Sequence, residues 1–226
     1  MRIGVFDIGY RNFAFCLEEY SSKNITKLQN QYKRLAKKDK IVERKEHSPV
    51  LEAVLNNFTK TGKILDLELK DLNKGEKCGL QNSTRLNLAE YLESKKELLA
   101  TCDKILIEQQ FKTGVACNFD AILLGESTYS WLVFNLGDKV TYTPSRYKTC
   151  LLGCPRTVME TRENGLRVAR DITKRDRKKW SKKRTIEILK SRGDKINIDY
   201  IEGRKADDVS DCILMALAWL LKTYVI

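Results

Sequence analysis

The sequence predicts a single α/β domain in which a mixed β-sheet is flanked by helices. The first reason is the order of patterns, because two strand-like segments open the chain and later strand-like segments alternate with helical ones. The second is composition, because 42% of the 226 residues are hydrophobic, which is enough for a packed core. With three prolines and no Pro-rich linker or internal repeat, we expect one domain over residues 1–226.

The strands are predicted from short alternating or apolar runs. Residues 2–8 alternate in polarity, with Ile3, Val5 and Asp7 on one face, as in a half-buried strand. A turn at 9–12 follows, and the next apolar run completes a predicted hairpin. The strand-like runs after the turn are 13–18, 104–108 and 139–143.

Helices are predicted where apolar residues recur at spacings of three and four. The last, from about Asp207 to Tyr224, is apolar around most of its circumference, so we expect it to be buried. The helix before it, at 173–192, is strongly basic and ends at Gly193. The remaining predicted helices span 49–60, 83–101 and 118–136.

One stretch has no clear periodicity. Residues 21–46 are polar and charged, which predicts an insertion or loop with some strand near Ile41 and Val42. The surrounding region, from about 21 to 80, contains no motif that connects with a function. The functional prediction therefore depends on the rest of the chain.

Composition limits the kinds of partner and chemistry. The chain has 42 Lys and Arg against 30 Asp and Glu, a net charge of +12, which indicates a polyanion such as nucleic acid or an anionic membrane surface. No apolar run is long enough to span a membrane, and no secretory leader is recognisable. His47 is the single histidine, so a multi-histidine zinc site is excluded. Seven irregularly spaced cysteines favour reduced thiols and an intracellular location.

Four acidic residues lie at the ends of predicted elements. Asp7 and Glu108 end strands, and Asp208 and Asp211 share one face of the first turn of the last helix, with Asp207 beside them. A carboxylate at the end of an apolar strand is costly to desolvate unless it is paired or bound to a metal. Each acid alone has a structural explanation, as a strand end, a helix cap or an ion-pair partner.

Taken together, the four acids indicate a metal site. If the strands are adjacent, the carboxylates meet at one edge of the sheet, where they repel one another unless a cation neutralises them. Carboxylate oxygens suit Mg²⁺ or Mn²⁺, and a pair of such ions can catalyse phosphodiester hydrolysis.

Three motifs resemble a known family. FDIGYRN at 6–12, IEQQF at 107–111 and KADDVSD at 205–211 are similar to segments of the RuvC-like Holliday junction resolvases of the RNase H-like superfamily. The last motif and its helix are most similar to the resolvases of poxviruses and other large DNA viruses. The resemblance implies an RNase H-like fold with a central mixed five-stranded sheet, in which an antiparallel hairpin or meander precedes parallel strands.

The resemblance also implies an activity. The protein would be a crossover junction endodeoxyribonuclease that cuts four-way DNA junctions symmetrically in recombination, repair and replication. It would act as a homodimer, without a small-molecule cofactor or a membrane, in the host cytoplasm if it is viral, with the nucleus left open. Asp7, Glu108, Asp208 and Asp211 would be catalytic and would bind Mg²⁺ or Mn²⁺, two ions per site.

Two further roles are implied by the family. Phe111, three residues after Glu108, would stack on a base of the junction. A lysine of the basic helix would lie near the scissile phosphate and stabilise charge there. Lys183 fits this position best, and Lys182 is the alternative.

The basic helix is expected to bind DNA. Residues 162–192 hold 13 Lys and Arg against 4 Asp and Glu. The alternatives are a solvated helix face and a nuclear localisation signal. The residues expected to contact phosphates are Arg177, Lys178, Lys179, Lys182, Lys183 and Arg184.

Two other functions remain open for the same residues. Another nuclease of the same fold, acting on RNA–DNA hybrids, would share the acids without needing a dimer. A non-catalytic DNA-binding protein would explain the basic segment but not the acids. FDIG also resembles a phosphate loop of actin-like and sugar-kinase ATPases. This class is disfavoured, because the sequence contains neither the second phosphate motif of such folds nor a GxxxxGK[ST] sequence.

Overall fold

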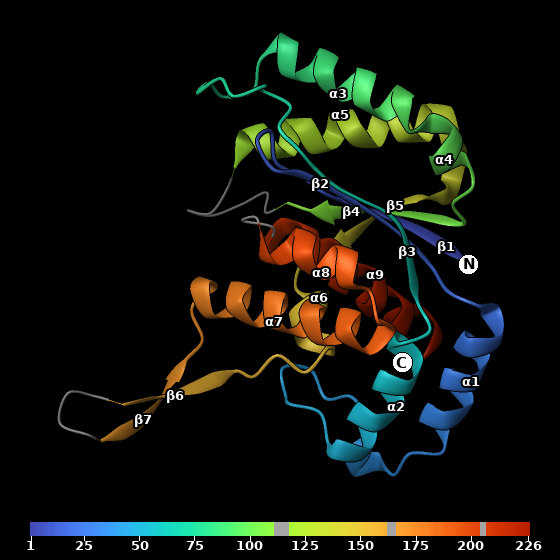
Figure 1. The fold of residues 1–226 in the computed structure, drawn as a ribbon, viewed down its shortest axis with the longest axis vertical. Helices are drawn as coiled ribbons and strands as arrows, with labels where there is room; N and C mark the ends of the chain where they lie inside the picture. Colours follow the sequence, from blue (N-terminus) through green and yellow to red (C-terminus); the bar gives the residue numbers. More distant parts are fainter. Residues whose placement is uncertain (111–117, 162–165, 204–206) are drawn as a thin grey trace.

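The computed structural model describes residues 1–110, 118–161, 166–203 and 207–226 (Figure 1). Five strands form the central sheet in the order β3-β2-β1-β4-β5. The pairs β1–β2 and β2–β3 are antiparallel, whereas β1–β4 and β4–β5 are parallel, which confirms the predicted mixed sheet. The strands are β1 (Arg2–Asp7), β2 (Phe13–Glu19), β3 (Lys63–Lys70), β4 (Lys104–Gln109) and β5 (Val140–Pro144).

Helices cover both faces of this sheet (Figure 1). On one face, Phe6 and Phe13 pack with a cluster formed mainly by α3 and α5. On the other face, Ile3 and Val5 pack against α9, most of whose residues are buried, as the sequence predicts. The helices are α1 (Ser22–Lys33), α2 (Pro49–Thr59), α3 (Asn82–Ser94), α4 (Lys96–Ala100), α5 (Phe119–Leu136), α6 (Tyr147–Leu151), α7 (Lys174–Arg192), α8 (Lys195–Glu202) and α9 (Asp207–Tyr224).

A two-stranded antiparallel ribbon stands apart from the sheet. It consists of β6 (Thr157–Thr161) and β7 (Arg167–Asp171), and it projects from the body between α6 and α7 (Figure 1). This ribbon was not predicted from the sequence. Of the helices in the described ranges, none is both long and apolar enough to cross a bilayer.

The region from 21 to 80 differs most from the prediction. The expected loop over 21–46 contains α1, which buries Ile25, Leu28 and Tyr32 along one face, and no strand forms at Ile41. The unpredicted strand β3 pairs with β2 at the edge of the sheet. Its residues Asp66 and Glu68 alternate with half-buried leucines. Because this alternation is weak, the strand was not predicted from the sequence. The predicted helix at 83–101 is divided into α3 and α4.

Candidate functional site

The first two acids of the site come from neighbouring parallel strands. Phe6 of β1 lies opposite Ile107 of β4, so the next residues, Asp7 and Glu108, emerge at the same edge of the sheet. Burial, the charge of Glu108 and a hydrogen bond with it raise the pKa of Asp7 well above its ordinary value. Burial opposes ionisation of Glu108 as well, but the charge of Lys148 and the hydrogen bond from Asp7 lower the pKa of Glu108. The two carboxyl groups are therefore close enough to shift each other's pKa.

The first turn of α9 brings the other acids to this edge. Asp211 has a side chain only 15% exposed, and burial raises its pKa, although Lys148 opposes the shift. Burial and the neighbouring Asp207 raise the pKa of Asp208 to about 6. Helix α9 packs on β1 and β2, which fixes its N-terminal turn relative to Asp7. The structure thus brings the four predicted acids from three elements to one region of the molecule.

Lys148 is the central cation of this region, and it was not among the residues predicted from the sequence. Its Nζ donates to Glu108 Oε1 at 3.0 Å and to Asp211 Oδ2 at 2.5 Å. Burial disfavours the charged amine, but the charges of Glu108, Asp211 and Asp7 prevail and raise the pKa of Lys148. Only its position in the sequence could have indicated this role. Lys148 follows the predicted strand 139–143 closely, and it is the one lysine in the segment YKTCLLG.

A second lysine contacts the acids from α7. Lys178 forms an ion pair with Asp207, and its Nζ lies 3.8 Å from Asp208 Oδ1. Lys178 was predicted as a DNA-binding residue, and the structure places it between that surface and the carboxylates. It is 45% exposed, so part of its ammonium group faces solvent.

The other predicted residues of the basic helix point in different directions. Lys183, the expected catalytic lysine, is 79% exposed and lies 3.9 Å from Glu187, on the outer side of α7. Arg184 is 12% exposed and pairs with Glu52 of α2 at 2.8 Å, so it joins two helices and is not presented to a ligand. Lys182 is half-buried, whereas Arg177 and Lys179 are exposed. Phe111 lies outside the described residues.

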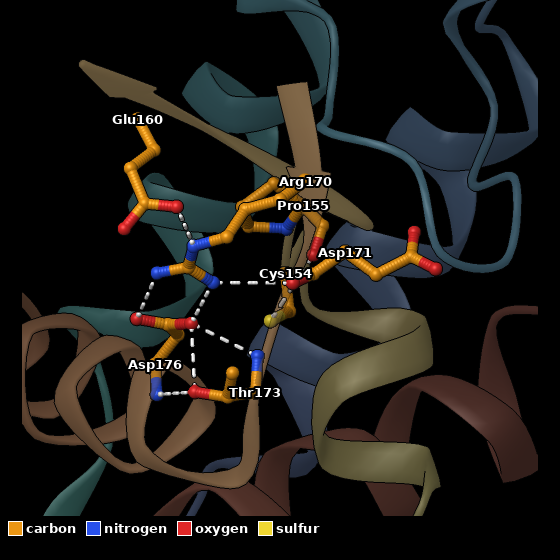
Figure 2. A network of polar contacts seen from close by, with 7 residues as sticks. All are labelled: Cys154, Pro155, Glu160, Arg170, Asp171, Thr173 and Asp176. Atoms are coloured by element: carbon orange, nitrogen blue, oxygen red, sulfur yellow. Dashed lines mark hydrogen bonds and ion pairs between the residues drawn. The ribbon is translucent and has the colours of Figure 1, made fainter. Parts of the chain in front are cut away.

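The start of α7 is held by a polar network at the base of the ribbon (Figure 2). Arg170 of β7 donates to Asp176 at 2.6 Å and to Glu160 of β6 at 3.0 Å. Asp176 and Thr173 form a reciprocal capping box at the first turn of the helix. The hydrogen bond from Arg170 and the amide of Thr173 hold the pKa of Asp176 well below its ordinary value. This network joins the ribbon to the first turn of α7.

The four carboxylates are ligands of the type that a divalent ion prefers, but in this structure Lys148 bridges two of them. Among the described residues, no three Asp, Glu, His or Cys side chains are close enough together to hold a metal ion. The ammonium of Lys148 lies between Glu108 and Asp211 and neutralises them instead. The second oxygen of Asp211, Oδ1, is buried and has no hydrogen-bond partner in the described part of the chain. A buried carboxylate oxygen without a partner, close enough to Glu108 to feel its charge, is an available ligand for a hard cation.

Comparisons with known proteins place the fold in one class. No known family model matches the chain, and no curated protein matches its sequence. Its fold is that of the RNase H-like resolvases. The Holliday junction resolvase of fowlpox virus is 14% identical, with a TM-score of 0.50 over 98% of this chain and 99% of that chain. RuvC from Thermus thermophilus is 10% identical, with a TM-score of 0.50 over 98% of this chain and 95% of that chain. These likenesses confirm the fold that the motifs predicted.

Proposed function

We propose that this protein is a Holliday junction resolvase, a metal-dependent endonuclease that cuts two strands of a four-way DNA junction. The observation that carries the proposal is the meeting of Asp7, Glu108, Asp208 and Asp211 at one edge of an RNase H-like sheet. Gathering four acids in one partly buried region is unfavourable, and Lys148 and Lys178 offset only part of the cost, because the pKa values of Asp7, Asp208 and Asp211 stay raised. Binding of divalent cations would offset the rest, and it would supply a function.

The four carboxylates would hold Mg²⁺ or Mn²⁺, two ions in the fullest form of the proposal. Bound there, the ions would polarise the scissile phosphate and activate water for phosphodiester hydrolysis. Lys148 would keep Glu108 and Asp211 ionised and close together, so that both are ready as ligands. Its charge would also stabilise negative charge on the phosphate as the transition state forms. We assign to Lys148 the function that the sequence suggested for Lys183.

DNA would approach along the N-terminal half of α7. Lys178 and the exposed Arg177 and Lys179 would contact phosphates next to the carboxylates, because an anionic site needs neighbouring cations to attract DNA. Lys182 and Lys183 remain proposed phosphate contacts farther along the helix. Arg184 is left out because Glu52 already neutralises it. Stacking by Phe111 remains a proposal from sequence.

A homodimer would supply the two active sites that paired cuts require. Helix α9 is buried in the core and is not available for a dimer interface. Helix α5 exposes Phe119, Leu123 and Phe134, at 73%, 44% and 88%, which is unusual for a helix in a monomer. We therefore place the proposed dimer interface on α5.

The test offers four substrates to the purified protein with Mg²⁺ or Mn²⁺. These are a synthetic four-way junction, a linear duplex of the same sequence, an RNA–DNA hybrid and a supercoiled plasmid with an extruded cruciform. We expect paired nicks in the junction and conversion of the plasmid directly to linear molecules, because a dimer cuts both strands in one encounter. Gel electrophoresis of the products measures both outcomes.

Each alternative has its own result in this experiment. Cleavage of the hybrid alone would identify a ribonuclease of the same fold. Binding of the junction without cleavage at any metal concentration would identify a non-catalytic DNA-binding protein. Plasmid that accumulates only as nicked circles would contradict the dimer while leaving the nuclease in place. EDTA added to a parallel reaction is the control for dependence on a metal ion.

A further inference from the structure

A second concentration of positive charge lies on α1 and the residues after it, far from the carboxylates. Residues 20–38 contain six Lys and Arg and no Asp or Glu, half of the net charge of +12. All six side chains are exposed, and none is in an ion pair with another described residue. They are Lys23, Lys27, Lys33, Arg34, Lys37 and Lys38.

The positive charge at the start of α1 is unfavourable for the helix. Helix α1 has no acidic residue in its first turn, where the helix dipole favours one, and it has Lys23 there instead. Lys23 and Lys27 are four residues apart and repel each other on one face. A surface that only needed to be soluble would gain from mixed charges. The arrangement therefore indicates a surface that is neutralised by a bound anion.

The outward face of α1 is fixed by what it buries. Ile25, Leu28 and Tyr32 pack into the core, which turns the opposite side toward solvent. There, basic and amide side chains line an open, shallow depression of about 550 Å³. We call this surface the α1 stripe, and it consists of Lys23, Lys27 and Arg34 with Asn24, Asn30 and Gln31.

The stripe has dimensions that suit a DNA backbone. Lys23 and Arg34 are eleven residues apart, which corresponds to about 16 Å along a helix. About five steps of a duplex cover the same length at roughly 3.4 Å each. Amide side chains donate hydrogen bonds to phosphate oxygens, as lysine and arginine do.

The stripe lies away from the proposed cutting site. Glu19, the last residue of β2, pairs with Arg2, the first residue of β1, whereas Asp7 is at the other end of β1, so α1 begins at the opposite end of the strands from Asp7. Figure 1 shows α1 on the side of the molecule where the N-terminus lies. The length of β1, roughly 20 Å, separates these two ends. The stripe and the Lys178 surface are thus two separate basic regions.

We propose that the α1 stripe is a second, sequence-independent contact for duplex DNA, which holds a part of the substrate outside the cutting site. The proposal rests on the proposed function in that the DNA held there belongs to the same junction. An anionic membrane surface is less suited to the stripe. A helix that lies on a membrane inserts an exposed apolar face, and the apolar face of α1 is already packed in the core.

The test removes three charges from the stripe and three from elsewhere. The variant is Lys23→Gln/Lys27→Gln/Arg34→Gln, and the control is Lys60→Gln/Lys195→Gln/Lys222→Gln, whose lysines are exposed on α8 and at the ends of α2 and α9. Fluorescence anisotropy without divalent metal measures binding of a linear duplex and of a long-armed junction over a series of salt concentrations. Thermal melting confirms that both proteins are folded.

We expect the stripe variant to bind both DNAs about 10-fold more weakly or worse. The slope of log affinity against log salt should fall by about 2.7, because three phosphate contacts are lost at roughly 0.9 each. For junction cutting, the half-saturating DNA concentration should rise while the rate at saturation changes less than about twofold. In the control variant, the slope should fall by less than half as much as it falls in the stripe variant.

Three outcomes would overturn the proposal. They are an unchanged salt slope, an equal loss in the control, and a loss of binding to anionic lipid vesicles with DNA binding intact. The proposal is tested separately from the nuclease function, because duplex binding needs no cleavage. If the wild-type protein cuts no junction but the stripe variant loses duplex affinity, the resolvase proposal fails and the stripe stands.

Discussion

Replacing Lys148 by methionine is expected to reduce junction cutting by about 10²-fold or more, the usual cost of losing one group that stabilises transition-state charge. Methionine has a similar shape, so the change removes mainly the ammonium that contacts Glu108 and Asp211. Because Lys148 favours the ionised form of both carboxylates, its loss raises their pKa values. The carboxylates then ionise at higher pH, so the acidic limb of the rate profile should move upward. Single-turnover rates measured over a pH series that begins below the ordinary carboxylate pKa of about 4 test this shift.

The same variant predicts an unusual response to metal. Without Lys148, Glu108 and Asp211 lie close together and partly buried with only the charge of Lys178 to oppose theirs, which destabilises the fold. Mg²⁺ can replace the missing charge, so it should raise the melting temperature of Lys148→Met more than that of the wild type. The matched control is Lys139→Met, because the hydrogen bonds of Lys139 Nζ within the described part of the chain go to the carbonyl oxygens of Leu99, Ala100 and Cys102. An equal response to Mg²⁺ in both variants would contradict the role assigned to Lys148.

Replacing Asp7 by asparagine is expected to abolish cutting, with a loss of at least about 10³-fold, while junction binding is kept or tightened. Asparagine keeps the shape but cannot carry the charge that binds a divalent ion, and its neutrality removes repulsion from DNA. Rates with Mg²⁺ and anisotropy without metal measure the two effects separately.

The control for Asp7→Asn is Asp138→Asn, which makes the same chemical change at an exposed residue between α5 and β5. It should leave the cutting rate within about twofold of the wild type, as expected for a surface change. Retained cutting by Asp7→Asn would remove Asp7 from the site. Lost binding by that variant would show that its effect is on the fold or the DNA surface.

The acids could be predicted from the sequence because their signals are local. Asp7 and Glu108 each follow an apolar strand, and Asp208 and Asp211 have the spacing of one helix face. The parallel pairing of β1 with β4 then brings the two strand ends together. Lys148 had no comparable signal, because its partners lie 40 and 63 residues away and only the tertiary fold brings them to it.

The composition of the basic helix was not sufficient to predict which of its residues face the carboxylates. Its charge was evident from the sequence, but the side of the helix that faces the carboxylates is set by packing. Burial of Ser181, Thr185 and Ile188 turns Lys178 toward the acids and Lys183 toward solvent. Similarly, α1 was hidden because its three buried residues lie among polar ones.

The most direct measurement of the central claim is anomalous diffraction from crystals of the protein grown or soaked with Mn²⁺. We expect manganese peaks within coordinating distance of Asp7, Glu108, Asp208 and Asp211, with the ammonium of Lys148 displaced from between Glu108 and Asp211. Manganese that binds elsewhere, with Lys148 still bridging the two carboxylates in crystals of a protein that cuts junctions, would contradict it.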